Sequence, residues 1–334
     1  MKTDGWMAQP GGVPHGPLRA CVEAAAAAPS VHNSQPWRFR LRGGTIDVLA
    51  DPTRELRVLD PTHRELMMSV GAAVFNLRIA MLARGRTPVT HLLPEADDPT
   101  VAARVTVGPP TTPSGTALAL AAAIPRRHSN RRPFSEIAVP PATLVDLGTA
   151  ARAEQARLVV VDPTARDAVL DLVRLAERRQ RHNPAYLGEL SAWTHHATGR
   201  RDGVPADAFG PRDLLETVPV RDFGVPGSLK RRPPVSFEHA PTVAVLYTPG
   251  DTPYHWLRGG QALERTLLTA TARGLASTIM TQPTEIPDLR ALLREPGDPY
   301  VAQAVVRFGY GPPSAASPRR PLEDVLLPAD GSHS

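Results

Sequence analysis

A short stretch near the beginning of the chain places many hydrogen-bonding side chains between two prolines. Pro29 and Pro36 each fix one backbone dihedral angle, so the turn between them is stiff. Hydroxyl, imidazole and amide groups supply its donors and acceptors, on Ser30, His32, Asn33, Ser34 and Gln35. Such a turn can bind a planar heterocycle with alternating carbonyl and N–H groups along its edge. A polar turn that caps its own backbone would have the same composition, so both interpretations stay open.

Two arginine-rich segments could bind an anion. The first has four arginines within seven residues, which repel one another unless an anion or carboxylates neutralise them: Arg126, Arg127, Arg131 and Arg132. The second holds Arg319 and Arg320 between two prolines near the end of the chain. A guanidinium group matches a phosphate with two parallel hydrogen bonds, which favours a phosphate site. A solvated basic loop and a simple tail are the alternatives.

Two successive sets of elements must position these segments. The first set is a helix, two strands, a long helix and two further strands, at about residues 17–28, 37–41, 45–50, 65–84, 89–93 and 102–107. The second set consists of helices at about residues 117–125, 141–152, 165–181 and 256–273, with strands at 157–161, 242–247 and 302–309. The helix at 65–84 is apolar nearly all round, which predicts a buried central position.

The two long helices share a pattern of small residues and arginine. In the first helix the pattern is formed by Gly71, Ala73, Ala83, Arg84 and Gly85. In the second it is formed, at the same spacing, by Gly260, Ala262, Ala272, Arg273 and Gly274. This match predicts a tandem duplication of one α/β unit, although residues this common can also agree by chance.

A long insertion without clear periodicity occupies residues 184–240, where glycine, proline and arginine are frequent. Long loops of this kind often serve as lids. The side chains that could then cover a ligand are Trp193, His195, His196 and Phe209. A disordered surface loop is the alternative. Residues 1–16 are predicted to be a disordered lead-in, and residues 312–334 a tail.

The composition argues against several classes of function. Of the 38 basic residues only Lys2 and Lys230 are lysine, and the net charge of +5 is scattered, which argues against a nucleic-acid partner. Cys21 is the only cysteine, and the adjacent histidines 195 and 196 lack acidic partners, so no metal site is predicted. Signal peptides, membrane spans and dinucleotide, P-loop or serine-hydrolase motifs are not recognisable. We therefore expect a soluble, cytoplasmic protein without a membrane partner.

The polar turn and the arginine segments together resemble the nitroreductase family. Pro29-Ser30-x-x-Asn33-x-Gln35-Pro36-Trp37 is similar to its flavin-contacting turn, and Arg127-His128-Ser129-x-Arg131 to its phosphate and ribityl motif. Residues 272–282, which include a predicted loop at 276–282, look like the segment under the flavin. The resemblance implies an α+β fold that binds FMN.

The same resemblance implies roles for individual residues. Arg127 would bind the FMN phosphate, aided by Arg319 and Arg320. Ser129 would contact the ribityl or phosphate end, and Arg131 would face N1 and O2, where a cation stabilises the reduced flavin. The ring system and ribityl chain would be contacted by the turn residues Pro29, Ser30, His32, Asn33 and Gln35. Thr278 or Met280, or their backbone N–H groups, would approach N5, and no side chain of the protein is expected to act as an acid or base.

The order of the motifs departs from that of ordinary nitroreductases. In those proteins the basic motif precedes the Pro-Ser turn within one subunit, and two subunits build two sites. Here the turn lies in the first half, 17–116, and the basic motif begins the second half, 117–334. Each half has kept one complementary part, which predicts a fused pseudo-dimer with one FMN per chain, similar to the Acg branch of the family. We expect this pseudo-dimer to be monomeric or to form a weak homodimer.

The function implied by the resemblance is that of an FMN-dependent NAD(P)H oxidoreductase. Hydride would pass from NAD(P)H to flavin N5 and then, in ping-pong order, to a small-molecule acceptor such as a nitroaromatic or a quinone. The alternative is a protein that sequesters FMN under a closed lid without turnover. Both functions need the same flavin-binding residues, so the motifs leave the choice between them open.

Overall fold

The computed structural model describes residues 6, 16–195, 199–215, 217–224, 232–294 and 297–328. The first sheet contains β1 (Trp37–Arg42), β2 (Thr45–Ala50), β3 (Arg86–Leu92) and β4 (Val101–Pro110). Its strand order is β1-β2-β4-β3, and all neighbours are antiparallel. Along β1 the buried residues Trp37, Phe39 and Leu41 alternate with more exposed arginines, so one face of the sheet packs on the core.

The second sheet repeats this topology. It contains β5 (Arg157–Val160), β10 (Thr242–Thr248), β11 (Ala276–Met280) and β12 (Val301–Gly309), in the order β11-β12-β10-β5. In each sheet the second and fourth strands along the chain are central, and a long helix connects the second strand to the third. These helices are α2 (Arg64–Ala83) and α7 (Pro253–Ala272). Each sheet is also preceded by a helix, α1 (Gly16–Ala26) in one case and α4 (Pro141–Ala153) in the other.

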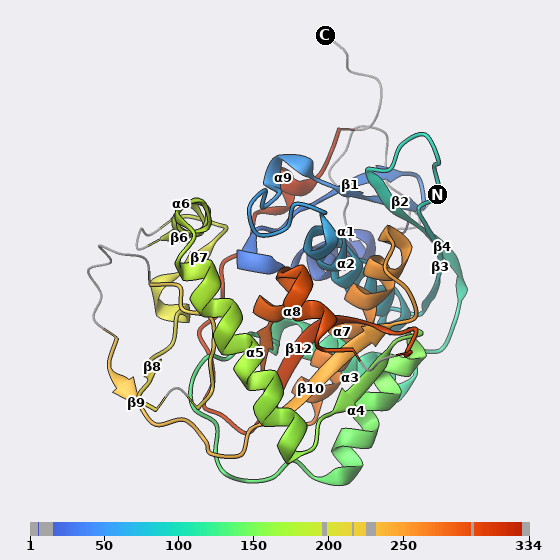
Figure 1. Cartoon of the computed structure of the whole chain (residues 1–334). Helices are drawn as coiled ribbons and strands as arrows, with labels where there is room; N and C mark the ends of the chain where they lie inside the picture. The colour runs from blue at the N-terminus through green and yellow to red at the C-terminus, as the bar shows by residue number, and fades with distance from the viewer. Residues whose placement is uncertain are drawn as a thin grey trace.

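The two long helices cross at a pair of glycines. A Cβ atom on Gly71 of α2 would overlap the carbonyl oxygen of Leu257, and a Cβ atom on Gly260 of α7 would overlap that of Met68. The two contacts are reciprocal, because each glycine meets the residue three positions before the other glycine. Only glycine permits backbones to approach so closely, so these two residues fix the crossing of the helices seen at the centre of Figure 1.

Helix α2 is buried nearly all round, as its apolar sequence predicts. Every residue from Arg64 to Leu77 is buried. The helix is long and apolar enough to cross a membrane by length and composition, but 83% of the relevant window is buried inside the protein. A central core helix passes that test as readily as a membrane span, and the packing of α2 against α7 identifies it as a core helix.

Several segments differ from the prediction. Residues 276–280 are not part of a loop but form the edge strand β11, paired with β12. The C-terminal segment is not a free tail, because α9 (Leu322–Val325) buries Leu322 and Val325, and the Leu327 N–H donates to the Phe39 carbonyl oxygen at 2.8 Å. The predicted lead-in, 1–16, lies almost entirely outside the described residues.

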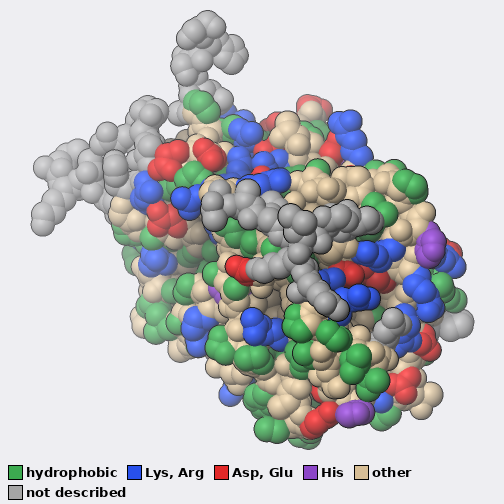
Figure 2. All heavy atoms as spheres, turned by 90° about the vertical axis from the view of Figure 1, so that its left-hand side faces the viewer, with side chains coloured by type: hydrophobic (Ala, Val, Ile, Leu, Met, Phe, Trp, Pro, Cys, Tyr) green, Lys and Arg blue, Asp and Glu red, His purple; other side chains and the backbone are tan. Residues whose placement is uncertain are grey.

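The insertion contains more regular structure than the sequence indicates. It holds α6 (Pro184–Ala192), β6 (Thr194–His195), β7 (Val204–Pro205), η4 (Ala206–Ala208), β8 (Arg212–Asp213) and β9 (Pro234–Val235). The remaining elements are η1 (Val31–Asn33), η2 (Pro52–Arg54), α3 (Gly115–Ala123), η3 (Ile124–Arg126), α5 (Pro163–Arg181), η5 (Gln282–Glu285) and α8 (Pro287–Ala291). The insertion lies on the left of Figure 1, and Figure 2 shows that face. On its described part, basic side chains lie among acidic and apolar ones.

Candidate functional site

One cavity collects most of the residues singled out in the sequence. Eight of the twelve predicted site residues line it: Pro29, Ser30, His32, Asn33, Arg127, Ser129, Arg131 and Arg319. They come from the turn before β1, the segment after η3 and the segment before α9. The chain therefore brings together three stretches that are far apart in the sequence. Gln35, Thr278, Met280 and Arg320 do not line the cavity.

The turn between Pro29 and Pro36 has an unusual backbone. His32, Asn33 and Gln35 have φ angles of 51°, 54° and 51°, in the left-handed region that non-glycine residues rarely adopt. The Oγ of Ser30 accepts a hydrogen bond from the Gln35 N–H at 2.9 Å and closes the turn. Strained backbone of this kind concentrates at functional sites, and here it directs His32 and Asn33 toward the cavity.

Amide side chains of the turn tie it to two distant segments. The Asn33 side-chain amide donates to the carbonyl oxygens of Gly203 and Pro318, each at 3.0 Å, and Asn33 Oδ1 accepts from Arg319 at 2.9 Å. Gln35 donates to the Arg201 carbonyl oxygen at 2.9 Å, and its Oε1 accepts from the Arg320 N–H at 2.8 Å. Gln35 and Arg320 therefore connect the turn to the insertion and to the C-terminal segment rather than lining the cavity.

One end of the cavity is strongly basic. Arg127 is buried, with its Nε 3.5 Å from Oε1 of Glu264, a fully buried residue of α7. Arg319 donates to the carbonyl oxygen of Ala27 at 3.1 Å. Burial and then the neighbouring Arg127 lower the pKa of Arg319 to about 9. Burial and these two arginines also lower the pKa of His128. This end of the cavity is therefore destabilised by its own positive charge, which an anion would relieve.

The opposite end combines cations with aromatic rings. The Arg131 guanidinium lies 4.6 Å from the ring centroid of Phe223 and donates to the Ala208 carbonyl oxygen at 3.0 Å. Burial and the nearby Arg221 lower the pKa of Arg131 to about 10. The His32 ring meets Phe223 edge-on at 5.5 Å. Burial, Arg221 and Arg131 hold the pKa of His32 well below its usual value, so its imidazole is neutral.

Helix α2 forms the wall between the two ends. Glu65, Met68, Ser69 and Ala72 line the cavity at the spacing of one helix face. The seven steps from Glu65 to Ala72, at a rise of about 1.5 Å each, make this wall roughly 10 Å long. Asn76, one turn further along, lies beside Glu264 at the basic end. Glu65 lies at the other end of the wall, near Arg221, so the cavity is elongated and its two ends differ chemically.

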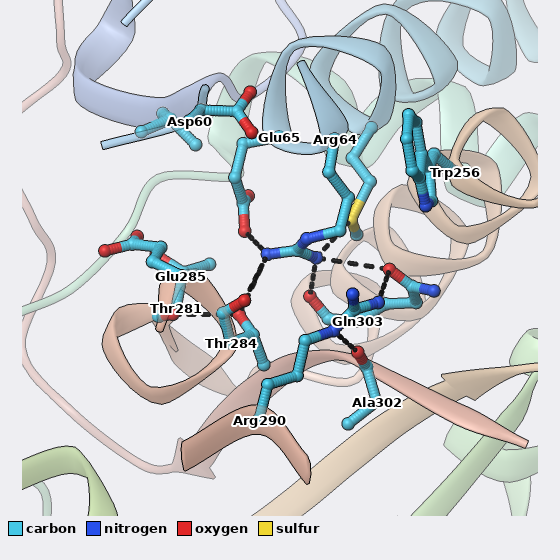
Figure 3. A network of polar contacts seen from close by, with 12 residues as sticks. Asp60, Arg64, Glu65, Trp256, Thr281, Thr284, Glu285, Arg290, Ala302 and Gln303 are labelled. Carbon is cyan, nitrogen blue, oxygen red and sulfur yellow. Dashed lines mark hydrogen bonds and ion pairs between the residues drawn. The ribbon is translucent and has the colours of Figure 1, made fainter. Parts of the chain in front are cut away.

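The Glu65 carboxylate is held by a buried network (Figure 3). It pairs with Arg64, whose guanidinium also donates to the carbonyl oxygens of Gln303 at 2.8 Å and Thr284 at 3.1 Å. Burial raises the pKa of Glu65 to about 7, opposed by Arg64 and reinforced by Glu285. Among the described residues that line the cavity, Glu65 is the one acidic side chain.

Strand alternation explains why Thr278 and Met280 lie elsewhere. Successive side chains of a strand point to opposite faces, and in the β11 segment Ile279 and the following Thr281 line the cavity. Thr278 is buried and donates to the Asn130 carbonyl oxygen at 2.5 Å, while Met280 packs in an apolar cluster on the other face. The structure thus brings the predicted segment to the cavity through the side chains of its alternate residues, Ile279 and Thr281.

Residues of the insertion also line the cavity, but not the ones that were predicted. They are Val204, Arg221 and Phe223. Arg221 pairs with Glu285 at 2.5 Å and donates to the Tyr186 hydroxyl at 2.7 Å. Of the predicted residues, Trp193 and Phe209 pack in the apolar cluster around Phe223, whereas the His195 side chain and His196 lie outside the described residues.

Sequence reasoning missed Glu65, Glu264, Arg221 and Phe223. A carboxylate within an otherwise apolar central helix was a usable signal for Glu65. Glu264 stands beside Arg265 in the more polar helix α7, so its residue type did not mark it. Arg221 and Phe223 stand in a segment without periodicity, so no pattern marked them. Within the described part of the chain, no group of three or more His, Cys, Asp or Glu side chains is placed to hold a metal ion.

The open volume of the cavity is about 100 Å³. Most small-molecule sites enclose about 300–1,000 Å³. Arg131 and Phe223 lie against each other at one end and narrow the space there.

Comparison with known proteins identifies the family. The family model for the nitroreductase family matches residues 124–310. The Mycobacterium tuberculosis (H37Rv) protein "Putative NAD(P)H nitroreductase Rv3131" is 33% identical over 315 residues, which cover 92% of this chain and 90% of the relative. "Putative NAD(P)H nitroreductase acg" of the same strain is 32% identical over 317 residues, covering 92% and 95%. A solved nitroreductase-like family protein from Bacillus cereus is 15% identical, covers 64% of this chain and 96% of its own, and has a TM-score of 0.39. The family match and these relatives show that the chain, with its α+β fold, belongs to the nitroreductase family.

Proposed function

We propose that the cavity binds one FMN and that the protein is an NAD(P)H-dependent oxidoreductase acting on a small electrophilic acceptor. The observation that supports this proposal most is that the polar turn, the Arg127 segment and Arg319 all line one cavity. The names of the relatives, which describe NAD(P)H nitroreductases, support the reductase over FMN sequestration. A nitroaromatic or a quinone is the class of acceptor that we propose.

The unsatisfied polar atoms of the cavity suit the chemistry of FMN. Arg127 Nε and Arg319 Nε are buried without a hydrogen-bond partner, and so are both ring nitrogens of His32. A phosphate would satisfy the two guanidinium groups with charge-assisted hydrogen bonds. A heterocycle with polar edges would offer partners to His32. The wall formed by α2, roughly 10 Å long, separates the arginines from His32. The phosphate and the ring system of a flavin nucleotide likewise lie at opposite ends of the molecule.

Bound FMN would supply the two-electron chemistry that connects a nicotinamide donor to the acceptor. The side chains of the protein would bind and orient it: Arg127 and Arg319 at the phosphate, and Arg131 at the N1 and O2 edge. Glu65, whose pKa is raised by burial, would place a titratable carboxyl group in the cavity. Phe223 and Val204 would keep water from the ring.

The insertion would act as a lid. Its Arg221 is fixed to the second half by Glu285, and its Phe223 packs against Phe209 with ring centroids 5.8 Å apart. The small open volume means that this segment must shift to admit FMN and a nicotinamide. The same segment then returns over the ring, which makes opening of the lid a candidate for the slow step of turnover.

The repeated topology supports a fused pseudo-dimer. Both sheets have one strand order, both are crossed by a long helix, and the glycine contacts between the helices are reciprocal. We infer that residues 17–116 and 117–334 descend from one unit. The turn comes from the first half and the Arg127 segment from the second, so one complete site per chain follows.

Two half-reactions followed without oxygen test this function. NADH or NADPH should bleach the flavin absorbance of the purified protein, and a quinone or nitroaromatic added afterwards should restore it. Bleaching by neither nucleotide would contradict the reductase and favour sequestration. A protein that retains no flavin after incubation with FMN would contradict both.

A further inference from the structure

Glu264 combines complete burial with unsatisfied polar atoms at the basic end of the cavity. Its carboxylate is fully buried in α7, and neither oxygen receives a well-formed hydrogen bond, although the Asn76 side chain interacts with it. Arg127 Nε lies 3.5 Å from Oε1 and is itself without a hydrogen bond, as is Nε of Arg319. Buried polar atoms are nearly always hydrogen-bonded, so an unsatisfied group of this kind calls for a ligand or a proton.

The surroundings of Glu264 contain few charges. Arg127 and Arg319 are the cations that act on it, and Asn76 of α2 adds a neutral amide. His128 lies next to both arginines. The neighbouring parts of α1 and α3 contribute apolar side chains, Ala24, Leu120 and Ala123 among them. One carboxylate thus faces two guanidinium groups in a region of low dielectric constant, and burial raises its pKa to about 7 against their influence.

A bound phosphate monoester would change the net charge around Glu264 from positive to negative. Its dianion would satisfy both arginines, but it would also place two negative charges near a buried carboxylate. Like charges at short distance inside a protein disfavour ionisation of both groups. Protonation of Glu264 removes this repulsion. Two guanidinium groups then face one phosphate dianion, and the protonated carboxyl group gains a hydroxyl that can donate a hydrogen bond.

We propose that Glu264 is a positioning residue that takes up one proton when a phosphate monoester binds between Arg127 and Arg319. The inference rests on the proposed function, which locates the FMN phosphate at these arginines. It makes Glu264 a determinant of specificity, because riboflavin lacks the phosphate and should bind without this proton. The inference also predicts how FMN affinity depends on pH. Above pH 7, where Glu264 of the free protein is ionised, the affinity should fall by about tenfold per pH unit. The fall should end at the pKa that Glu264 has in the complex, which is higher.

Calorimetric titration of the apoprotein with FMN at pH 8 measures this proton directly. The titration is run in two buffers that differ in ionisation enthalpy and contain no phosphate. The wild type should take up close to one proton per FMN. Glu264→Gln, which mimics the protonated side chain in shape and charge, should take up almost none and should lose the fall in affinity above pH 7. Riboflavin should bind without uptake to either protein.

His128 supplies the matched control, because it is the histidine beside the two arginines. Its pKa is lowered from the usual value, so His128 is neutral at pH 8 before FMN binds, and the proposal assigns the proton taken up to Glu264 and not to His128. His128→Gln should therefore keep the uptake at pH 8. FMN binding without proton uptake by the wild type, or equal uptake by Glu264→Gln, would overturn the inference and leave the proposed function standing. Failure of the wild type to bind FMN would overturn both.

Discussion

At the basic end of the cavity, Arg127 is the side chain with the clearest single role. It is buried, its Nε has no hydrogen bond, and its neighbour Arg126 is exposed. Arg127→Ala should weaken FMN binding by about 10- to 150-fold, the equivalent of a charge-assisted hydrogen bond of roughly 1.5–3 kcal/mol. Arg126→Ala removes the same charge from the surface and should leave the affinity unchanged. Equal effects of the two substitutions in a fluorescence titration would refute the phosphate assignment.

The buried carboxylate of Glu264 also predicts how stability depends on pH. Its folded-state pKa is raised from 4.5 to about 7, so the folded protein binds a proton that the unfolded chain has released between these values. The contribution of this group to stability is present below pH 4.5 and is lost as pH rises to about 7. Glu264→Gln should remove the loss, which amounts to as much as about 3 kcal/mol.

Urea unfolding of the ligand-free protein at pH 5 and pH 7.5 measures this difference. The wild type should lose stability relative to Glu264→Gln between these two pH values. The free energy of unfolding of the variant minus that of the wild type should therefore be larger at pH 7.5 than at pH 5. Parallel pH profiles of the two proteins would show that Glu264 is not a buried proton-binding group. Because the two proteins are compared at the same pH, the contributions of their other titrating groups to the free energy of unfolding cancel.

Residue types and spacing could predict part of the site. The prolines, the polar turn and the arginines are local features, and eight of the twelve predicted residues line the cavity. Glu264 could not be assigned in this way, because its role depends on Arg127 and Arg319, which approach it only in the folded chain. The same applies to Arg221, whose partner Glu285 belongs to η5.

At the level of elements, the crossing of α2 and α7 depends on two glycines. Gly71→Ala and Gly260→Ala would each drive a methyl group into a backbone carbonyl oxygen of the other helix. Overpacking costs about 1–3 kcal/mol where side chains can adjust, and backbone cannot adjust as easily. We therefore expect each substitution to lower the free energy of unfolding by at least this amount and to loosen flavin binding.

Gly188 provides the control for these helix glycines. It lies within α6, and a Cβ atom there would meet no heavy atom within 4 Å. Gly188→Ala should stabilise the protein by up to about 1 kcal/mol, because alanine favours a helix. Thermal unfolding of the three variants compares the two sites. Tolerance of alanine at Gly71 and Gly260 would contradict the close crossing.

Periodicity predicted most elements, since a 3.6-residue pattern marks a helix and apolar runs mark strands. It failed for β11, which is an edge strand of five residues and resembled a loop. Because β11 is a strand, its alternate side chains Ile279 and Thr281 line the cavity, and Thr278 and Met280 do not. It also failed for α6 and the short strands of the insertion, which are too short to show a period.

At the level of the whole molecule, the arrangement joins two similar sheets and inserts a third segment over their shared cavity. The order of the motifs predicts a fusion from sequence, because the turn precedes β1 and the Arg127 segment follows η3. The sequence could not show that the C-terminal segment folds back on β1, which brings Arg319 to Asn33 at 2.9 Å. That contact links residues 286 positions apart, beyond the range of any local pattern.

The amount of flavin bound per chain tests the central claim most directly. Purified protein is saturated with FMN, freed of excess by gel filtration, and measured for flavin absorbance and protein concentration by amino-acid analysis. One cavity assembled from both halves predicts one FMN per chain. Two FMN per chain, or protein that stays colourless after incubation with FMN, would contradict it.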